Sequence, residues 1–530
     1  MRKFVAFISV VLALIIAVTP LSSFAASPVE PTTEEKFEAL TQIDITKYNL
    51  PTDRKIKVAC VGDSITHGND NRTHPAYPSY LQDILGDGYE VKNFGLGGTT
   101  LQSAFDENGK ATVGAAYMSC EWYQQGLDFN PDVVIIMLGT NDSGDFAFKR
   151  LEKHYAKDYQ TLIDSYKNLP SKPLVFVATS PYLVAESGSS ARVNDVIVPY
   201  QRELFTQLNG VDGVVDIYSW SENRYYLYTD AVHYSEEGYY SLAIEYARNI
   251  FGLKNGYNTY KVKAVPGAVV KFEKKNTGSV PYVYNAVADK DGIAYCYGTA
   301  GDYSLTVRAE DYARYTTELT LNESSDIDCP MVAGDHNVAL FRPVTASSDA
   351  HENVVAERTN DRSAATCWQP RENNATSAWL LYDLGETKEI HGIVIESWFQ
   401  AYASGYNVQV SDDGENFTTV ATIRDGKGNG YDTHYFDSAS GRYVKVNFTQ
   451  KGYFFNYEIY DLQLLSNDER TVSQRELDYI AEEEAKKQQQ EEQNKEKAPA
   501  KAPNALPWLV ADGAIIVAAV AAVIIIKKKK

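Results

Sequence analysis

Short apolar runs alternate with longer segments of helical periodicity between residues 55 and 253, and this alternation limits the fold of that region to one class. Continuous apolar runs are typical of strands buried on both faces of a parallel sheet, with helices covering those faces. We therefore expect an α/β domain of about 200 residues. The expected strands are residues 56–61, 90–94, 133–138, 174–178 and 211–217, and the expected helices are residues 77–85, 151–169, 197–208 and 236–251.

The chain has 530 residues, which is too long for a single core, and its sequence pattern changes after residue 253. Alternating stretches separated by Gly, Asp and Asn turns predict a small β-sandwich over residues 257–330, for which a spacer role is the simplest interpretation. A second all-β domain of short alternating strands is expected over residues 337–466. Residues 467–505 are rich in Glu, Lys and Gln, a composition that cannot bury a core and predicts a helical or extended stalk.

The first residues have the layout of a secretory signal peptide. Arg2 and Lys3 precede an apolar run at residues 4–18, and small residues follow up to residue 25. This order of basic, apolar and small residues predicts a signal peptide over residues 1–25, and therefore export. Residues 26–54 are polar and contain prolines, so we interpret them as a leader into the first domain.

A second apolar segment predicts a membrane anchor. Residues 506–526 are apolar apart from Asp512, and four lysines follow at 527–530. This pattern favours a single membrane-spanning helix with a cytoplasmic lysine tail over a buried core helix, with the preceding domains outside the membrane. A sortase signal has the same layout, but residues 506–510 lack the Thr-Gly of the LPxTG pattern, so a retained span is favoured.

Charge and cysteine content exclude two other classes of protein. The formal net charge of −20 would repel a phosphate backbone, so nucleic acid is not an expected partner. Five cysteines are too few for a disulfide scaffold in a chain of this length. The sequence leaves open whether Cys296 and Cys329 pair.

A candidate nucleophile lies in residues 58–68, which read V-A-C-V-G-D-S-I-T-H-G. An apolar run meets a Gly-Asp-Ser turn there, which places the Ser64 hydroxyl at the edge of a sheet. Serine becomes a nucleophile only when a base takes its proton and prearranged donors stabilise the oxyanion. Polar turns that can supply these groups follow later strands, at residues 93–98, 139–142 and 230–233.

The three later turns carry residue types suited to those roles. Asp230 and His233 are three residues apart, so one turn can place the carboxylate against the imidazole, and His233 would act as general base. Gly95 can offer its backbone N–H because no side chain intervenes, Asn141 offers an amide, and the Ser64 N–H is a third oxyanion donor. Each turn alone is common, but their combination on an α/β frame predicts an active site.

These four turns resemble the SGNH, or GDSL, hydrolase family, whose four sequence blocks centre on Ser, Gly, Asn and His. The resemblance covers residues 55–251. It implies a three-layer, flavodoxin-like α/β fold with a five-stranded parallel sheet. It also implies Ser64 as nucleophile, an oxyanion hole of Ser64, Gly95 and Asn141, and His233 as base with Asp230 as its partner. The family includes lipases, thioesterases, phospholipases and carbohydrate acetylesterases, so the substrate stays open.

No cofactor is expected for catalysis. His67, His74 and His154 have no Cys or carboxylate partners at metal-ligand spacing, so we interpret them as surface or pocket residues. We interpret Asp63 as a structural hydrogen-bonding residue rather than a catalytic one.

The third domain resembles a second family on six segments, at residues 337–339, 344–348, 361–368, 379–385, 410–414 and 442–446. They resemble the coagulation factor type C, or discoidin, family and its relatives, the family 32 carbohydrate-binding modules. The resemblance implies a β jelly roll with a structural calcium bound by Asp361, Thr366 and Asp461, which are the oxygen ligands calcium prefers. Arg362 stands where that family usually has Gly, which puts the calcium in doubt.

Sugar recognition requires an aromatic ring against the sugar face and polar groups for the hydroxyls, presented on loops. The alternative for each aromatic residue is burial in the core, which is common for such residues. The candidates are His351, Arg371, Asn373, Trp398, Phe399, Phe454 and Phe455.

Together these features predict a membrane-anchored extracellular serine esterase. Its expected reaction removes O-acetyl groups from glycans that the discoidin-like module holds nearby. A lipase or phospholipase is the alternative enzyme, and no long apolar lid segment is found near Ser64 or His233 to favour it. A surface adhesin that has lost activity is the alternative outside enzymes, and the complete catalytic set argues against it.

Overall fold

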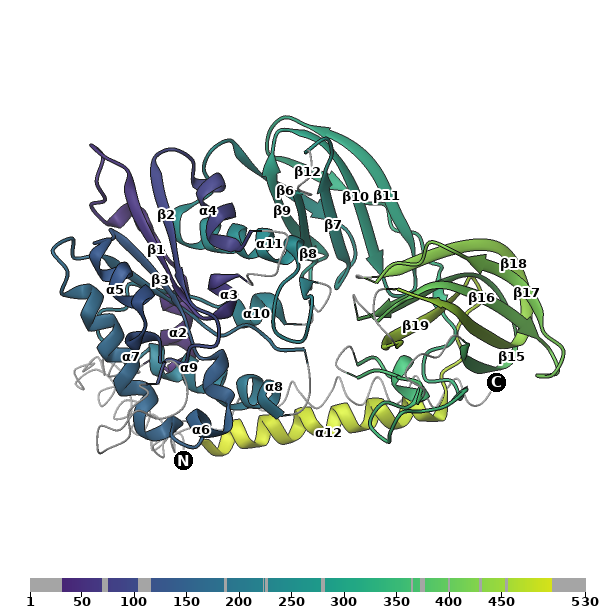
Figure 1. Cartoon of the computed structure of the whole chain (residues 1–530). Coiled ribbons are helices and arrows are strands. Elements are labelled where there is room, and N and C mark those ends of the chain that lie inside the picture. Colours follow the sequence, from purple (N-terminus) through teal and green to yellow (C-terminus); the bar gives the residue numbers. More distant parts are fainter. Residues whose placement is uncertain are drawn as a thin grey trace, which may run out of the picture. The chain divides into compact units, whose positions relative to one another are not determined.

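The computed structural model describes residues 31–68, 75–102, 116–184, 188–222, 224, 227–277, 282–363, 366–371, 377–398, 401–428, 431–452 and 456–497. The chain divides into two compact units, residues 1–471 and 472–530. Within its described residues, the first unit holds an α/β region and two all-β regions (Figure 1).

The α/β region is built on a parallel sheet with strand order β2-β1-β3-β4-β5. Val58 of β1 pairs with Val91 of β2 on one side and with Val133 of β3 on the other. The order of the strands therefore reverses direction between β1 and β3, which is where open α/β sheets bind ligands. The strands are β1 (Ile56–Gly62), β2 (Tyr89–Gly95), β3 (Val133–Met137), β4 (Leu174–Ala178) and β5 (Gly213–Val215).

Helices cover both faces of this sheet (Figure 1). One face packs against α4 (Tyr77–Leu85) and α11 (Glu236–Tyr246), and the other against α7 (Leu151–Lys167) and α9 (Val198–Phe205). Successive side chains of β1 alternate between the two faces, since Val58 belongs to the first core and Ala59 to the second. Both are fully buried, which explains the continuous apolar run in the sequence.

Two of the expected helices have π-helical turns. The segment expected at 236–251 is α11 followed by a π-helical turn at Ala247–Phe251. The segment expected at 197–208 begins earlier, with a π-helical turn at Val193–Ile197 that leads into α9. The remaining helices of this region are α3 (Ser64–His67), α5 (Glu121–Asp128), α6 (Asp145–Phe148), α8 (Gly188–Arg192) and α10 (Ile217–Ser221), with 3-10 helices at Ile45–Lys47, Tyr117–Ser119 and Thr140–Ser143.

The segment interpreted as a polar leader contains a helix, α2 (Thr33–Thr41), which corrects the sequence prediction. A capping box starts it: the Thr32 hydroxyl accepts from the Glu35 N–H, and the Glu35 carboxylate accepts from the Thr32 N–H. Phe37 is buried in the same core as α7 and α9. Phe37 and Leu40 are the only large apolar side chains of this short polar helix, and two such residues give little periodicity, so the sequence did not indicate this packing.

The middle region consists of two small antiparallel-rich sheets with strand orders β11-β10-β7-β8 and β12-β6-β9, as expected for a small sandwich. Cys296 and Cys329 are buried free thiols, so no disulfide joins them. The strands are β6 (Tyr257–Lys263), β7 (Val269–Lys274), β8 (Tyr282–Val287), β9 (Ile293–Thr299), β10 (Gly301–Ala309), β11 (Tyr312–Leu321) and β12 (Ser325–Asp328).

The third region has strand order β13-β19-β15-β18-β16-β17, with β14 paired to β15. Its core holds the fully buried Trp368, stacked on Phe448. The strands are β13 (His336–Asn337), β14 (Val344–Ala346), β15 (Ala378–Ser397), β16 (Ala403–Ser411), β17 (Thr418–Ile423), β18 (Asp432–Lys451) and β19 (Ile459–Ser466), with a 3-10 helix at Ala356–Thr359.

The second unit contains α12 (Gln474–Lys497), so the segment predicted to be a stalk is helical over these residues. Among the described residues, no helix is long and apolar enough to cross a membrane. The expected membrane span at residues 506–526 and the expected signal peptide at residues 1–25 lie outside the described residues.

Candidate active site

Ser64 lies at the carboxyl end of β1, as the first residue of the short helix α3. A Cβ at Gly62 would collide with the Thr66 side chain, so only glycine allows this tight turn. The buried Asp63 caps the helix by accepting a hydrogen bond from the Ile65 N–H at 3.0 Å. Burial raises the pKa of Asp63 to about 6. This capping contact agrees with the structural role expected for Asp63.

Three predicted catalytic side chains form a continuous hydrogen-bonded chain. His233 Nε2 lies 2.8 Å from the Ser64 hydroxyl oxygen, and His233 Nδ1 lies 2.9 Å from Asp230 Oδ2. Residues 64 and 233 are far apart in sequence. Ser64 follows β1, whereas His233 lies in the loop between α10 and α11, so the turn at 230–233 does not directly follow a strand as the sequence predicted. The geometry lets His233 accept the Ser64 proton while Asp230 holds the opposite ring nitrogen.

The turn that carries Asp230 and His233 is closed by hydrogen bonds among its own residues. Asp230 Oδ1 accepts from the Val232 N–H at 2.8 Å and from the His233 N–H at 2.6 Å. The Thr229 N–H donates to the His233 carbonyl at 2.8 Å. Partial burial acts to raise the pKa of Asp230, but the hydrogen bond and positive charge from His233 and the two backbone N–H groups outweigh it and hold that pKa below its ordinary value. Asp230 is therefore kept ionised beside the imidazole.

Asn141 and Asp142 connect the turn after β3 to the segment after β2. The Asn141 amide donates one N–H to the Thr99 carbonyl at 3.0 Å, which leaves its second N–H for a substrate oxygen. Asp142 is fully buried and accepts from the Leu101 N–H at 2.8 Å and the Gln102 N–H at 3.1 Å. Burial raises the pKa of Asp142 to about 7. Together these contacts fix the position of the Asn141 side chain.

Gly95 does not fit the oxyanion role that the sequence suggested. Its N–H already donates to the Asn93 side-chain oxygen at 2.9 Å. A Cβ at Gly95 would collide with the His67 backbone, so this glycine allows β2 to pack closely on α3. Gly97 lies nearer to the nucleophile, because a Cβ there would be 3.7 Å from Ser64 Cβ. The repeated glycines of G-L-G-G were the signal for Gly97, but the sequence could not rank them.

The other histidines that the structure describes in this region lie outside the hydrogen-bonded chain of Ser64, His233 and Asp230. His67 Nδ1 accepts from the Gly97 N–H at 3.3 Å, and its ring lies edge-on to Trp122 with centroids 6.5 Å apart. Burial lowers the pKa of His154. His74 lies outside the described residues. Within the part of the chain that the structure describes, no group of three His, Cys, Asp or Glu side chains could hold a metal ion.

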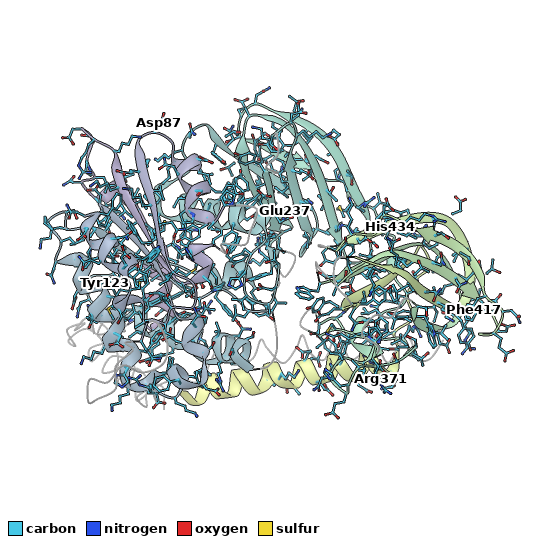
Figure 2. The ribbon with its side chains drawn as sticks, in the orientation of Figure 1. Asp87, Tyr123, Glu237, Arg371, Phe417 and His434 are labelled. Carbon is cyan, nitrogen blue, oxygen red and sulfur yellow. The ribbon has the colours of Figure 1, made fainter. Side chains whose placement is uncertain are left out.

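Two predicted sugar-binding residues lie on adjoining loops of the third region. His351 and Arg371 are both exposed, and Figure 2 labels Arg371. The Ala350 N–H donates to the Gln369 carbonyl at 2.9 Å, which joins the two loops. The Arg371 Nε–H donates to the Asp349 carbonyl at 3.3 Å. The other candidates Asn373, Phe399, Phe454 and Phe455 lie outside the described residues.

Trp398, predicted to contact sugar, instead contacts the catalytic turn. Its indole N–H donates to the Thr229 carbonyl at 3.0 Å, and its side chain is half-buried. The sequence could not indicate this contact because the two residues are 169 positions apart.

The predicted calcium ligands offer oxygen atoms of the correct type. The Thr366 hydroxyl donates to Asp361 Oδ2 at 3.0 Å. Burial raises the pKa of Asp461 to about 6, and the nearby Asp361 carboxylate adds to that rise. Arg358 Nη1 also lies 3.3 Å from Asp361 Oδ2 and supplies positive charge at the same place. Two carboxylates and a hydroxyl fit a calcium ion only if backbone oxygens complete the shell. Calcium therefore stays a prediction.

Comparison with known proteins identifies two families within the chain. Residues 60–240 match the GDSL-like Lipase/Acylhydrolase family, and residues 343–459 match the F5/8 type C domain family. The chain therefore carries a GDSL-like acylhydrolase domain and an F5/8 type C domain. Both resemblances seen in the sequence are confirmed.

Individual relatives cover only parts of the chain. An acetylxylan esterase of Xylanibacter ruminicola is 46% identical over 95 residues, which are 18% of this chain and 18% of that protein. A chitosan-binding module from a Paenibacillus chitosanase/glucanase is 31% identical, covers 24% of this chain and 98% of its own, and has a TM-score of 0.23. A family 32 module of Clostridium perfringens, solved with galactose, is 20% identical, covers 23% and 93%, and has a TM-score of 0.22.

Proposed function

We propose that this protein is a serine esterase that removes acyl groups, acetyl foremost, from carbohydrate. The observation that carries the proposal is the hydrogen-bonded chain from the Ser64 hydroxyl through His233 to Asp230. Such a chain at the carboxyl edge of a parallel sheet is suited to acyl transfer, because it activates a hydroxyl without a metal.

The reaction would proceed in two halves. Ser64 Oγ attacks the ester carbonyl as its proton moves to His233 Nε2, and the second N–H of Asn141 and the Ser64 N–H would stabilise the oxyanion. Collapse expels the sugar alcohol, which takes the proton from His233, and leaves an acyl group on Ser64. Water then attacks this acyl-enzyme, again with His233 as base, and releases the carboxylic acid and free Ser64.

Two observations favour a carbohydrate ester over a lipid ester. The F5/8 type C domain presents His351 and Arg371 on exposed, joined loops, which is suitable for binding sugar hydroxyls. The matched Xylanibacter ruminicola protein is an acetylxylan esterase. Tethering a sugar-binding domain to the esterase would raise the local concentration of substrate.

The proposed location is the outer surface of the cell membrane. The basic, apolar and small residues of segment 1–25 support export, and the apolar segment 506–526 followed by lysines supports a membrane anchor. The helix α12 would then be part of the stalk before the anchor.

Acetate release from acetylated xylan, acetylated pectin and O-acetylated sialic acid would test the proposal. Wild-type protein should release acetate from at least one of them, and Ser64→Ala should reduce the rate by about a thousandfold or more. Faster hydrolysis of long-chain lipid esters than of every acetylated glycan would indicate a lipase instead. Hydrolysis of no ester at all would contradict an enzymatic role and favour a glycan-binding adhesin.

A further inference from the structure

We propose that Trp398 of the F5/8 type C domain is a positioning residue for the catalytic turn of the acylhydrolase domain. The inference rests on the proposed function, since it assigns a role in the same site. The Trp398 indole N–H donates to the Thr229 carbonyl at 3.0 Å. That carbonyl belongs to the peptide joining Thr229 to Asp230, so the bond acts directly beside the catalytic carboxylate.

The turn transmits this contact to His233. The Thr229 N–H donates to the His233 carbonyl at 2.8 Å, and the Thr229 hydroxyl donates to the same carbonyl at 3.2 Å. Asp230 in turn accepts from the His233 N–H and from His233 Nδ1. Thr229, Asp230 and His233 therefore move as one unit, and a hydrogen bond that fixes the Thr229 peptide also fixes the imidazole against Ser64.

Trp398 is itself held by the corner of the β-sandwich. The Trp398 backbone N–H donates to the Glu458 carbonyl at 3.0 Å, and the Trp398 backbone carbonyl accepts from the Ala401 N–H at 3.0 Å. The Glu458 N–H donates to the Ala401 carbonyl at 2.8 Å, which closes the corner between β15 and β19. A tryptophan side chain has only two rotatable bonds, so a ring mounted this way loses little conformational entropy when it forms the contact.

The acylhydrolase domain provides a second anchor, which sets the expected size of the effect. The Val184 N–H donates to the Ala231 carbonyl at 3.0 Å and holds the turn from the segment that follows β4. Loss of the Trp398 bond should therefore loosen the turn without releasing it. We expect a loss of about three- to tenfold in the rate of the chemical step, the range of one hydrogen bond.

The test compares Trp398→Phe with Trp379→Phe in the full chain. The first variant removes the donor N–H and retains an aromatic ring, and the second makes the same change on β15, where Trp379 packs against Lys445. p-Nitrophenyl acetate is the substrate, because it is too small to need the sugar-binding loops. Active serines are counted with a fluorophosphonate, whose phosphorus bonds to Ser64 Oγ as fluoride leaves. The rate constant of that labelling is the second readout.

Trp398→Phe should lower kcat per labelled serine and the labelling rate constant about three- to tenfold, with KM unchanged, whereas Trp379→Phe should match wild type. A purely stabilising role would reduce the number of labelled serines and leave the rate per serine intact, which would overturn the inference. Equal rates in the two variants would also overturn it. If wild type hydrolyses no ester but is labelled, the labelling rate constants of the two variants still test the role of Trp398. If it is not labelled either, the proposed function fails and the inference fails with it.

Discussion

Asp142 shows how a residue outside the hydrogen-bonded chain of Ser64, His233 and Asp230 can determine its geometry. Its two oxygens accept the Leu101 and Gln102 N–H groups and so hold the segment whose Thr99 carbonyl orients Asn141. The carboxyl is fully buried, and burial is the main cause of its raised pKa. The buried Asp142 carboxyl therefore holds the predicted oxyanion donor Asn141 in a fixed position.

This raised pKa predicts a pH-dependent stability. Because the pKa of Asp142 is about 7 in the folded protein and about 4 unfolded, the folded state binds more protons between those values, and stability falls as pH rises through that window. Asp142→Asn removes the titration. We expect the melting temperature of wild type to fall more between pH 4.5 and pH 7.5 than that of the variant. Parallel melting curves across this range would contradict the prediction, whatever their absolute offset.

At the scale of elements, helix α2 packs against the α/β region that carries Ser64. It contacts α9 and β5, and the Arg202 guanidinium lies over the Phe37 ring, 5.6 Å from its centroid. Phe37→Ala should remove this buried ring and destabilise the domain by about 3 kcal/mol. The midpoint of inactivation in urea should then move to a lower concentration.

Phe146→Ala is the matched control for this prediction, because Phe146 is 46% exposed. It should leave the midpoint of inactivation close to that of wild type. Equal midpoints for Phe37→Ala and wild type would mean that residues 33–41 do not support the domain and act as the leader that the sequence suggested.

At the scale of the whole molecule, the F5/8 type C domain is expected to hold the enzyme on its substrate. Arg371→Ala removes an exposed guanidinium from the joined loops, and charge-assisted hydrogen bonds are among the stronger contacts to polar ligands. We expect binding of the full chain to insoluble acetylated xylan, measured by depletion from solution, to weaken about tenfold. Arg424→Ala changes an exposed arginine of the same domain and should bind as wild type does. Equal binding of the two variants would remove Arg371 from the sugar site.

The sequence predicted much of the fold because strands and helices of this kind have local signatures. The expected helix at 77–85 and the expected strand at 174–178 match α4 and β4 at both ends. Helix α2 was missed because its packing depends on only two large apolar side chains, Phe37 and Leu40. Phe399, Phe454 and Phe455 stay predictions, as do the membrane anchor and calcium.

The sequence by itself determined that Ser64 and Asn141 lie at strand ends, because apolar periodicity places strands and polar turns end them. It also indicated that Asp230 and His233 share one turn, although that turn lies between α10 and α11 and not at a strand end. Only the tertiary structure decided which atoms meet. It assigned the Gly95 N–H to Asn93, brought Gly97 beside Ser64, and joined Trp398 to Thr229. These contacts link residues far apart in the chain through distances of a few ångströms, and no local pattern of side chains encodes such distances.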